Sequence, residues 1–131
     1  MTDNTRASVA IVDDDPQLVR TYELLFKHRQ VPVSFIAYDS YSALIKFNNA
    51  SPRPGVVIID YRMPYKNGLD LMIEILKIEP DTKIIFISAD DSIGQSVLDA
   101  GADVFLKKPT SIKEIMDSVS LVSGSSYRST L

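Results

Sequence analysis

Five side chains that can take part in chemistry stand directly after short apolar runs of the chain: Asp13, Asp14, Asp60, Ser88 and Lys108. If these runs are parallel strands of one sheet, their carboxyl ends meet at one edge, where open α/β sheets bind their ligands. Clustered carboxylates without histidine or cysteine suit a hard cation such as Mg²⁺, and Mn²⁺ is compatible with the same ligands. A lysine and a hydroxyl add donors for phosphate oxygens, and a carboxylate can act as a nucleophile. The set therefore predicts phosphoryl transfer.

We also considered ordinary structural roles for these residues and for the neighbouring Asp15. Asp15 precedes Pro16, so we expect it to cap a helix rather than to bind a ligand. Asp13 and Asp14 repel each other and gain nothing structurally unless they share a cation. Asp60 is followed by a turn that needs no cap. Taken alone, the serine and the lysine are typical of a turn and of a solvated side chain, but their occurrence in order, each after a different strand, favours a common site.

The apolar runs predict the strands of this sheet. Four runs are too short for helices and rich in β-branched or aromatic residues, so we expect strands buried on both faces at 9–12, 56–59, 84–87 and 104–106. A fifth run at 31–38 alternates more and contains Pro32, which cannot donate to a ladder. We therefore expect this fifth strand at a sheet edge.

Helical spacing of apolar residues separates the strands. Strong stripes begin after Asp15-Pro16, at Leu69 and after Thr110-Ser111, and weaker ones occur at Tyr41, Leu44 and Ile45 and at Ile93, Val97 and Leu98. Strict alternation of strand and helix predicts an α/β fold, a doubly wound parallel sheet with helices on both faces.

Length and composition are those of one globular domain. The chain has 131 residues, 45% of them hydrophobic, and its formal net charge is −3. A net negative charge does not favour binding to nucleic acid or to an anionic membrane. The absence of cysteine excludes thiolate chemistry. Without a signal pattern or an apolar stretch that could span a membrane, a cytoplasmic location is expected. We expect the domain at 1–122 and a flexible tail or the start of a linker at 123–131.

Four segments together resemble the receiver domains of two-component response regulators. They read IVDDDP at 11–16, IIDYRMPYKNG at 58–68, IFISA at 85–89 and GADVFLKKP at 101–109, and the resemblance extends over about 9–119. No single motif is decisive, but the ordered set is specific. The resemblance implies a flavodoxin-like fold of five parallel strands in the order 2-1-3-4-5.

The resemblance also implies roles for the strand-end residues. Asp60 would accept the phosphoryl group. Asp14 would bind Mg²⁺ directly and Asp13 largely through water, with Asp60 and the main-chain carbonyl of Arg62 completing the protein ligands. Lys108 would contact the phosphate, whereas the lysine before it would be solvated.

A switch is implied as well. Ser88 would donate a hydrogen bond to the phosphoryl group and let Phe105 rotate inward, and the Lys108–Pro109 bond is a candidate for the cis form. Lys108 stands 20 positions after Ser88, slightly fewer than the family pattern suggests. We therefore expect a short fourth helix or preceding loop, and an altered surface at the fourth helix, fifth strand and fifth helix.

The implied partners are those of a signalling domain rather than an enzyme with substrate turnover. They are a sensor histidine kinase or phosphotransfer protein, a downstream effector or a missing C-terminal output domain, and a second copy in a phosphorylation-dependent homodimer. One alternative is a receiver-like module that signals by contact without phosphorylation. The other is a haloacid-dehalogenase-like phosphatase with Asp13 as nucleophile and Asp15 as general acid, which needs Thr or Val where Gln17 stands and leaves Asp60 unexplained.

Overall fold

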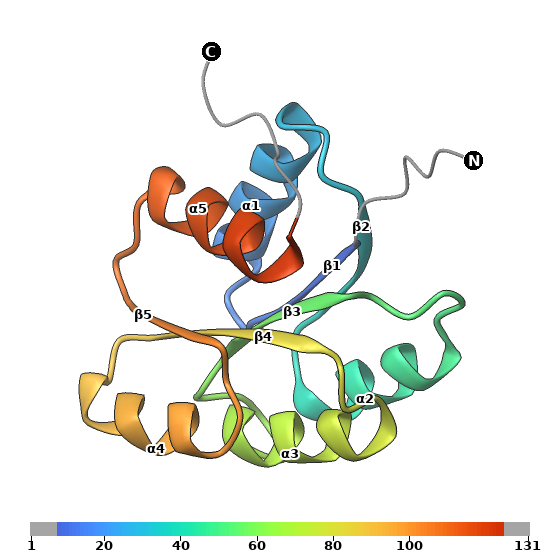
Figure 1. The fold of residues 1–131 in the computed structure, drawn as a ribbon, viewed down its shortest axis with the longest axis vertical. Helices are drawn as coiled ribbons and strands as arrows, with labels where there is room; N and C mark the ends of the chain where they lie inside the picture. Colours follow the sequence, from blue (N-terminus) through green and yellow to red (C-terminus); the bar gives the residue numbers. More distant parts are fainter. Residues whose placement is uncertain (1–7, 125–131) are drawn as a thin grey trace.

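A parallel sheet of five strands forms the middle layer of the computed structural model, which describes residues 8–124 (Figure 1). The strands are β1 (Val9–Val12), β2 (Val33–Ala37), β3 (Val56–Asp60), β4 (Lys83–Ser88) and β5 (Val104–Lys107). The helices are α1 (Pro16–His28), α2 (Ser40–Asn49), α3 (Gly68–Ile78), α4 (Gly94–Asp99) and α5 (Ile112–Ser123), with a 3₁₀ turn η1 (Asp91–Ile93) before α4. The order β2-β1-β3-β4-β5 confirms the predicted topology.

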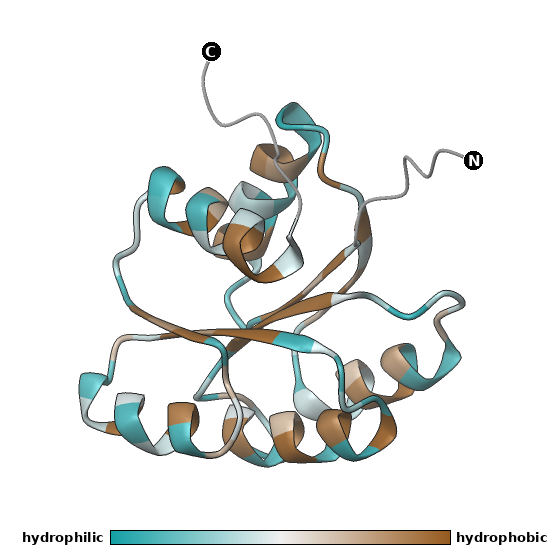
Figure 2. Ribbon diagram, viewed as in Figure 1, coloured by the Kyte–Doolittle hydropathy of each residue, from teal (hydrophilic) through white to brown (hydrophobic). Residues whose placement is uncertain are grey.

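Two apolar cores hold the layers together. Helices α1 and α5 cover one face of the sheet, and α2, α3 and α4 cover the other (Figure 1). Alternate residues of each central strand point to opposite cores, so that Val9 and Ile11 belong to one and Ala10 and Val12 to the other. The central strands are therefore mostly brown in Figure 2, as the continuous apolar runs predicted, and the polar residues of β3 and β4 stand at the strand ends.

The two outer strands are less buried than the central three. The prediction of an edge position for the second strand is confirmed, since within residues 8–124 β2 pairs with β1 alone. Burial of 104–106 on both faces was a wrong expectation, because Val104, Phe105 and Leu106 are only half-buried. The strand β5 pairs with β4 and ends the order of the strands, so it lies at the other edge of the described sheet.

Helix α2 buries only part of the expected stripe. Leu44 packs partly against the core, but Tyr41 and Ile45 are exposed, and the fully buried face is formed by Ser40, Ala43 and Phe47. The small side chains bring the start of the helix close to its neighbours, and apolar spacing alone did not reveal this face.

The helix ends follow local signals. The Asp15 carboxylate accepts hydrogen bonds from the backbone N–H groups of Gln17 and Leu18, which confirms its role as a helix cap. Helix α4 has six residues and is the shortest α-helix of the described part, which confirms the short segment expected there.

Helix α5 ends at Ser123, and Gly124 caps it with a left-handed φ of 70°. The rest of the tail expected at 123–131 lies outside the described residues. Within residues 8–124, no helix is sufficiently long and apolar to cross a membrane.

Candidate functional site

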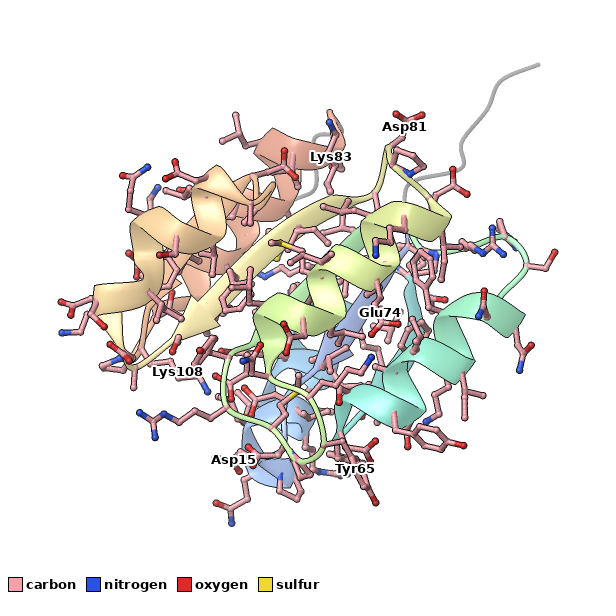
Figure 3. All side chains as sticks on the ribbon, turned by 90° about the horizontal axis from the view of Figure 1, so that it is seen from below. Asp15, Tyr65, Glu74, Asp81, Lys83 and Lys108 are labelled. Carbon is pink, nitrogen blue, oxygen red and sulfur yellow. The ribbon has the colours of Figure 1, made fainter. Side chains whose placement is uncertain are left out.

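The side chains singled out by the sequence come together at the carboxyl ends of the strands. Asp60 and Ser88 are the last residues of β3 and β4, Asp13 follows β1, and Lys108 follows β5. In Figure 3, Lys108 and Asp15 lie toward one end of the sheet, whereas Asp81 and Lys83, at the start of β4, lie at the opposite end. The parallel topology therefore gathers residues that are far apart in the chain.

Three carboxylates form a compact acidic cluster at this edge. Asp13, Asp14 and Asp60 each place an oxygen within 4.8 Å of the others. Asp13 and Asp60 are buried and Asp14 is exposed, so the cluster opens to solvent on one side. The backbone N–H of Asp15 donates to Oδ1 of Asp13 at 3.0 Å and orients that carboxylate. A donor set made only of oxygens fits Mg²⁺, which keeps part of its water shell.

Lys108 reaches into this cluster. Its Nζ donates to Oδ2 of Asp13 at 2.9 Å and lies 3.2 Å from Oδ1 of Asp60. Lys107 instead makes an exposed ion pair with Asp91 at 3.4 Å. The Lys108–Pro109 peptide bond is cis, as is Ser51–Pro52. Of the two adjacent lysines, the second therefore faces the acidic site.

Burial and charge shift the pKa values of the central groups. Burial raises the pKa of Asp60, the charge of Asp13 raises it further, and the ammonium of Lys108 opposes both. Burial alone would lower the pKa of Lys108, but its hydrogen bond with Asp13 and the charges of Asp13 and Asp60 raise it overall. The lysine is thus held as a cation beside two carboxylates.

Tyr22 of α1 lies near the site, although the sequence analysis did not single it out. It is buried, and burial raises its pKa to about 12, with Lys108, Asp13 and Asp60 close enough to influence it. A tyrosine in an apolar helical stripe carries no signal of such a position.

A pocket of about 310 Å³ opens beside the cluster. It is lined by Asp60, Arg62, Ser88, Ala89, Asp90 and Lys108. The Ser88 oxygen accepts a hydrogen bond from the backbone N–H of Asp90 at 3.1 Å, so its hydroxyl hydrogen can point to another acceptor. Asp90, which the sequence analysis did not single out, caps the η1 turn through Ser92. Hydrogen bonds from Ser92 lower the pKa of Asp90.

The loop from β3 to α3 packs tightly against the backbone of Asp60. The N–H of Gly68 donates to the carbonyl of Tyr61 at 2.7 Å. A Cβ at Gly68 would lie 2.2 Å from the main-chain oxygen of Asp60, so only glycine fits this approach. The loop that carries the Arg62 carbonyl is therefore bound closely to the end of β3.

Phe105 lies on β5, next to the strand that ends in Ser88. Its neighbour across the ladder is Phe86, and its ring faces α4, where a Cβ at Gly94 would meet it at 3.1 Å. The ring is partly buried against the core beneath α3 and α4. Phe105 thus lies on the strand that leads to Lys108, with its ring turned toward α4.

Sequence comparison finds one protein family. The response regulator receiver domain pattern matches residues 9–120. The response regulator MprA of Mycobacterium avium is 31% identical over 110 residues, which are 82% of this chain and 47% of that protein. The transcriptional regulatory protein TrcR of Mycobacterium tuberculosis is 28% identical over 116 residues, 87% of this chain and 44% of that protein. The chain thus spans about half the length of these relatives.

Comparison with solved structures agrees. A chain of the CheX-CheY-BeF₃-Mg²⁺ complex from Borrelia burgdorferi matches with a TM-score of 0.83 and 27% identity, covering 88% of each chain. The receiver domain of the Francisella response regulator 1452 matches with a TM-score of 0.82 and 29% identity, covering 90% of this chain and 97% of that one.

Proposed function

The chain belongs to the response regulator receiver domain family, and we propose that Asp60 accepts a phosphoryl group in a reaction that requires Mg²⁺. One observation carries the proposal: Asp13, Asp14 and Asp60 cluster within 4.8 Å, with Lys108 in contact with two of them. A purely structural role does not account for three carboxylates gathered around one cation, because their mutual repulsion costs stability.

The transfer needs a nucleophile that is aligned and a phosphoryl group whose charge is neutralised. A carboxylate oxygen of Asp60 attacks phosphorus and forms the P–O bond, while the P–N bond to the imidazole of the donor histidine breaks and that imidazole takes up a proton. Asp13, Asp14, Asp60 and the main-chain carbonyl of Arg62 would hold Mg²⁺. When bound, the ion neutralises charge on the phosphoryl oxygens.

Lys108 and Ser88 would then act on the product. The Lys108 ammonium, already 3.2 Å from Asp60, is placed to pair with an oxygen of the phosphorylated side chain. Ser88 would donate its hydroxyl hydrogen to another phosphoryl oxygen and draw the loop after β4 toward the site. Phe105 would turn into the space left behind, which changes the surface of β5 and α4.

The proposed partners follow from this chemistry. The donor is a sensor histidine kinase or a phosphotransfer protein, and small phosphodonors serve in its place. The readout is an effector protein, a C-terminal output domain, or a phosphorylation-dependent homodimer; the greater length of the relatives is compatible with a further domain. We propose no nucleic-acid contact for this domain alone, since its formal net charge is −3.

Intact mass measurement tests the proposal. The protein is incubated with acetyl phosphate or phosphoramidate, with and without Mg²⁺, alongside Asp60→Asn and the surface control Asp117→Asn. We expect one phosphoryl group on wild type and control, dependent on Mg²⁺, and none on Asp60→Asn. No addition to folded wild type would favour a module that signals by contact alone. Continued release of phosphate over many turnovers would favour a phosphatase.

A further inference from the structure

A buried serine hydroxyl ties the loop between β3 and α3 to the start of α2. Ser40 is 2% exposed, and its Oγ donates to the carbonyl of Pro64 at 3.1 Å. The same oxygen accepts a hydrogen bond from the backbone N–H of Lys66 at 2.8 Å. The hydroxyl thus uses its donor and an acceptor on the same short piece of backbone.

The residue between these two partners has an unfavourable backbone conformation. Tyr65 has a φ of 75°, in the left-handed region that non-glycine residues seldom adopt. Its side chain is 81% exposed and touches the ring of Tyr41, with centroids 6.0 Å apart. Such a conformation persists where the surroundings enforce it. The hydrogen bonds of Ser40 on either side of Tyr65 supply that enforcement from within the protein.

Ser40 itself belongs to a helix that is packed against the core. Ser40 is the first residue of α2, whose cap Asp39 accepts the N–H of Ser42 at 2.7 Å. The same face of the helix buries Ala43 and Phe47 in the core. The position of the hydroxyl is therefore determined by the packing of α2 rather than by the loop that it holds.

We propose that Ser40 is a positioning residue for the metal and phosphoryl site. The loop that it holds leads from Asp60 to α3 and carries the main-chain carbonyl of Arg62, a residue that lines the pocket beside Asp60. Ser40 reaches none of the reacting groups and acts through the backbone of the loop. Removal of the hydroxyl frees the turn at Tyr65 and, with it, the Arg62 carbonyl. The inference rests on the proposed function, in which that carbonyl is a metal contact.

If the role of Ser40 were purely structural, loss of its hydroxyl would lower stability without affecting Mg²⁺ binding. Thr82 supplies the matched control. Its side chain is also buried, and its hydroxyl donates to the carbonyl of Glu79 at 2.8 Å. It lies just before β4, at the end of the sheet marked by Asp81 and Lys83 in Figure 3, away from Lys108. Thr82→Val therefore removes a comparable hydrogen bond far from the site.

The experiment measures Mg²⁺ binding without any phosphodonor, by titration of backbone amide signals in NMR spectra. The variants are Ser40→Ala, Ser40→Cys, Ser40→Thr and Thr82→Val, and thermal unfolding of each is recorded in EDTA. We expect Ser40→Ala to raise the Mg²⁺ dissociation constant about tenfold, as loss of an outer-shell partner does. Ser40→Thr should restore most of the affinity, Ser40→Cys should lie between, and Thr82→Val should bind Mg²⁺ as wild type does.

Mg²⁺ affinity of Ser40→Ala within about twofold of wild type, together with reduced thermal stability, would overturn the inference. If Ser40→Ala does not fold, the cysteine variant decides, and unchanged affinity there has the same meaning. Wild type that binds no Mg²⁺ would also overturn it. Wild type that binds Mg²⁺ but is never phosphorylated contradicts the proposed function instead, and the affinities still decide the role of Ser40.

Discussion

Replacement of Asp60 by asparagine should make the metal-free protein more stable. Asp60 is 7% exposed and shares its site with two other carboxylates, and the ammonium of Lys108 lies beside it. Asparagine has nearly the same shape and carries no charge. The substitution therefore removes charge repulsion and the cost of burying a carboxylate, while the contact between Lys108 and Asp13 remains.

The magnitude follows from the distances. At an effective dielectric constant of about 20, a 3.2 Å contact with the ammonium attracts by about 5 kcal/mol, and each carboxylate within 4.8 Å repels by about 3.5 kcal/mol or more. Two repulsions thus exceed one attraction by about 2 kcal/mol, and solvent around the exposed Asp14 reduces this. We expect Asp60→Asn to gain about 1 to 2 kcal/mol near pH 7, or about 3 to 10 °C in Tm.

The gain should depend on pH with a defined sign. Burial and Asp13 raise the pKa of Asp60 above its ordinary value of 3.8, so the folded protein holds this proton to higher pH than the unfolded chain does. Wild type therefore loses stability as pH rises from about 4 through the raised pKa. The difference between variant and wild type should therefore shrink as pH falls, vanish below about pH 3, where both states hold the proton, and be complete at neutral pH.

Urea unfolding followed by circular dichroism, in EDTA and across pH, measures the effect. Asp117→Asn serves as the control, because that carboxylate is exposed and forms an exposed ion pair with Lys113, so its loss should change stability by about 0.5 kcal/mol or less. At saturating Mg²⁺, wild type should be more stable than Asp60→Asn, because only wild type retains all the carboxylates proposed to bind the ion. Asp60→Asn equal to or less stable than wild type in EDTA at neutral pH would refute the charge balance.

Three further substitutions test the site. Lys108→Ala should destabilise the metal-free protein by about 3 kcal/mol and slow phosphorylation, because two buried carboxylates lose their cation. The control Lys107→Ala should change stability by about 0.5 kcal/mol or less. Equal effects of the two substitutions in unfolding and labelling assays would contradict the assignment of Lys108. Gly68→Ala should lower the free energy of unfolding by about 3 kcal/mol, because the new Cβ would lie 2.2 Å from a backbone oxygen. At Gly94 the new Cβ would contact a phenylalanine ring that can turn, so Gly94→Ala should lower it by about 1 kcal/mol or less, as measured by thermal unfolding. Tyr22→Phe should leave the pH profile of the phosphorylation rate unchanged between about pH 6 and pH 10, because burial raises the pKa of the Tyr22 phenol to about 12 and keeps it neutral. A changed profile would show that the hydroxyl takes part in the reaction.

Some features of this protein follow from the sequence alone. Alternating apolar runs and helical stripes predicted the five-stranded parallel sheet, and the polar residues after each run predicted which side chains meet at its edge. These inferences succeed because short apolar runs, helical spacing and helix caps are local signals, and because parallel strands place their carboxyl ends together. Asp13, Asp60 and Lys108 could thus be grouped before any contact between them was known.

Other features depend on tertiary packing. The half-burial of β5 results from its place at the sheet edge, and the buried face of α2 results from close packing of Ser40 and Ala43. The contacts of Ser40 with a loop 24 to 26 residues away, and the closeness of Tyr22 to the acidic cluster, leave no periodic trace in the chain. Each depends on the orientation of a helix that crosses over the sheet, and only the packed structure determines that orientation.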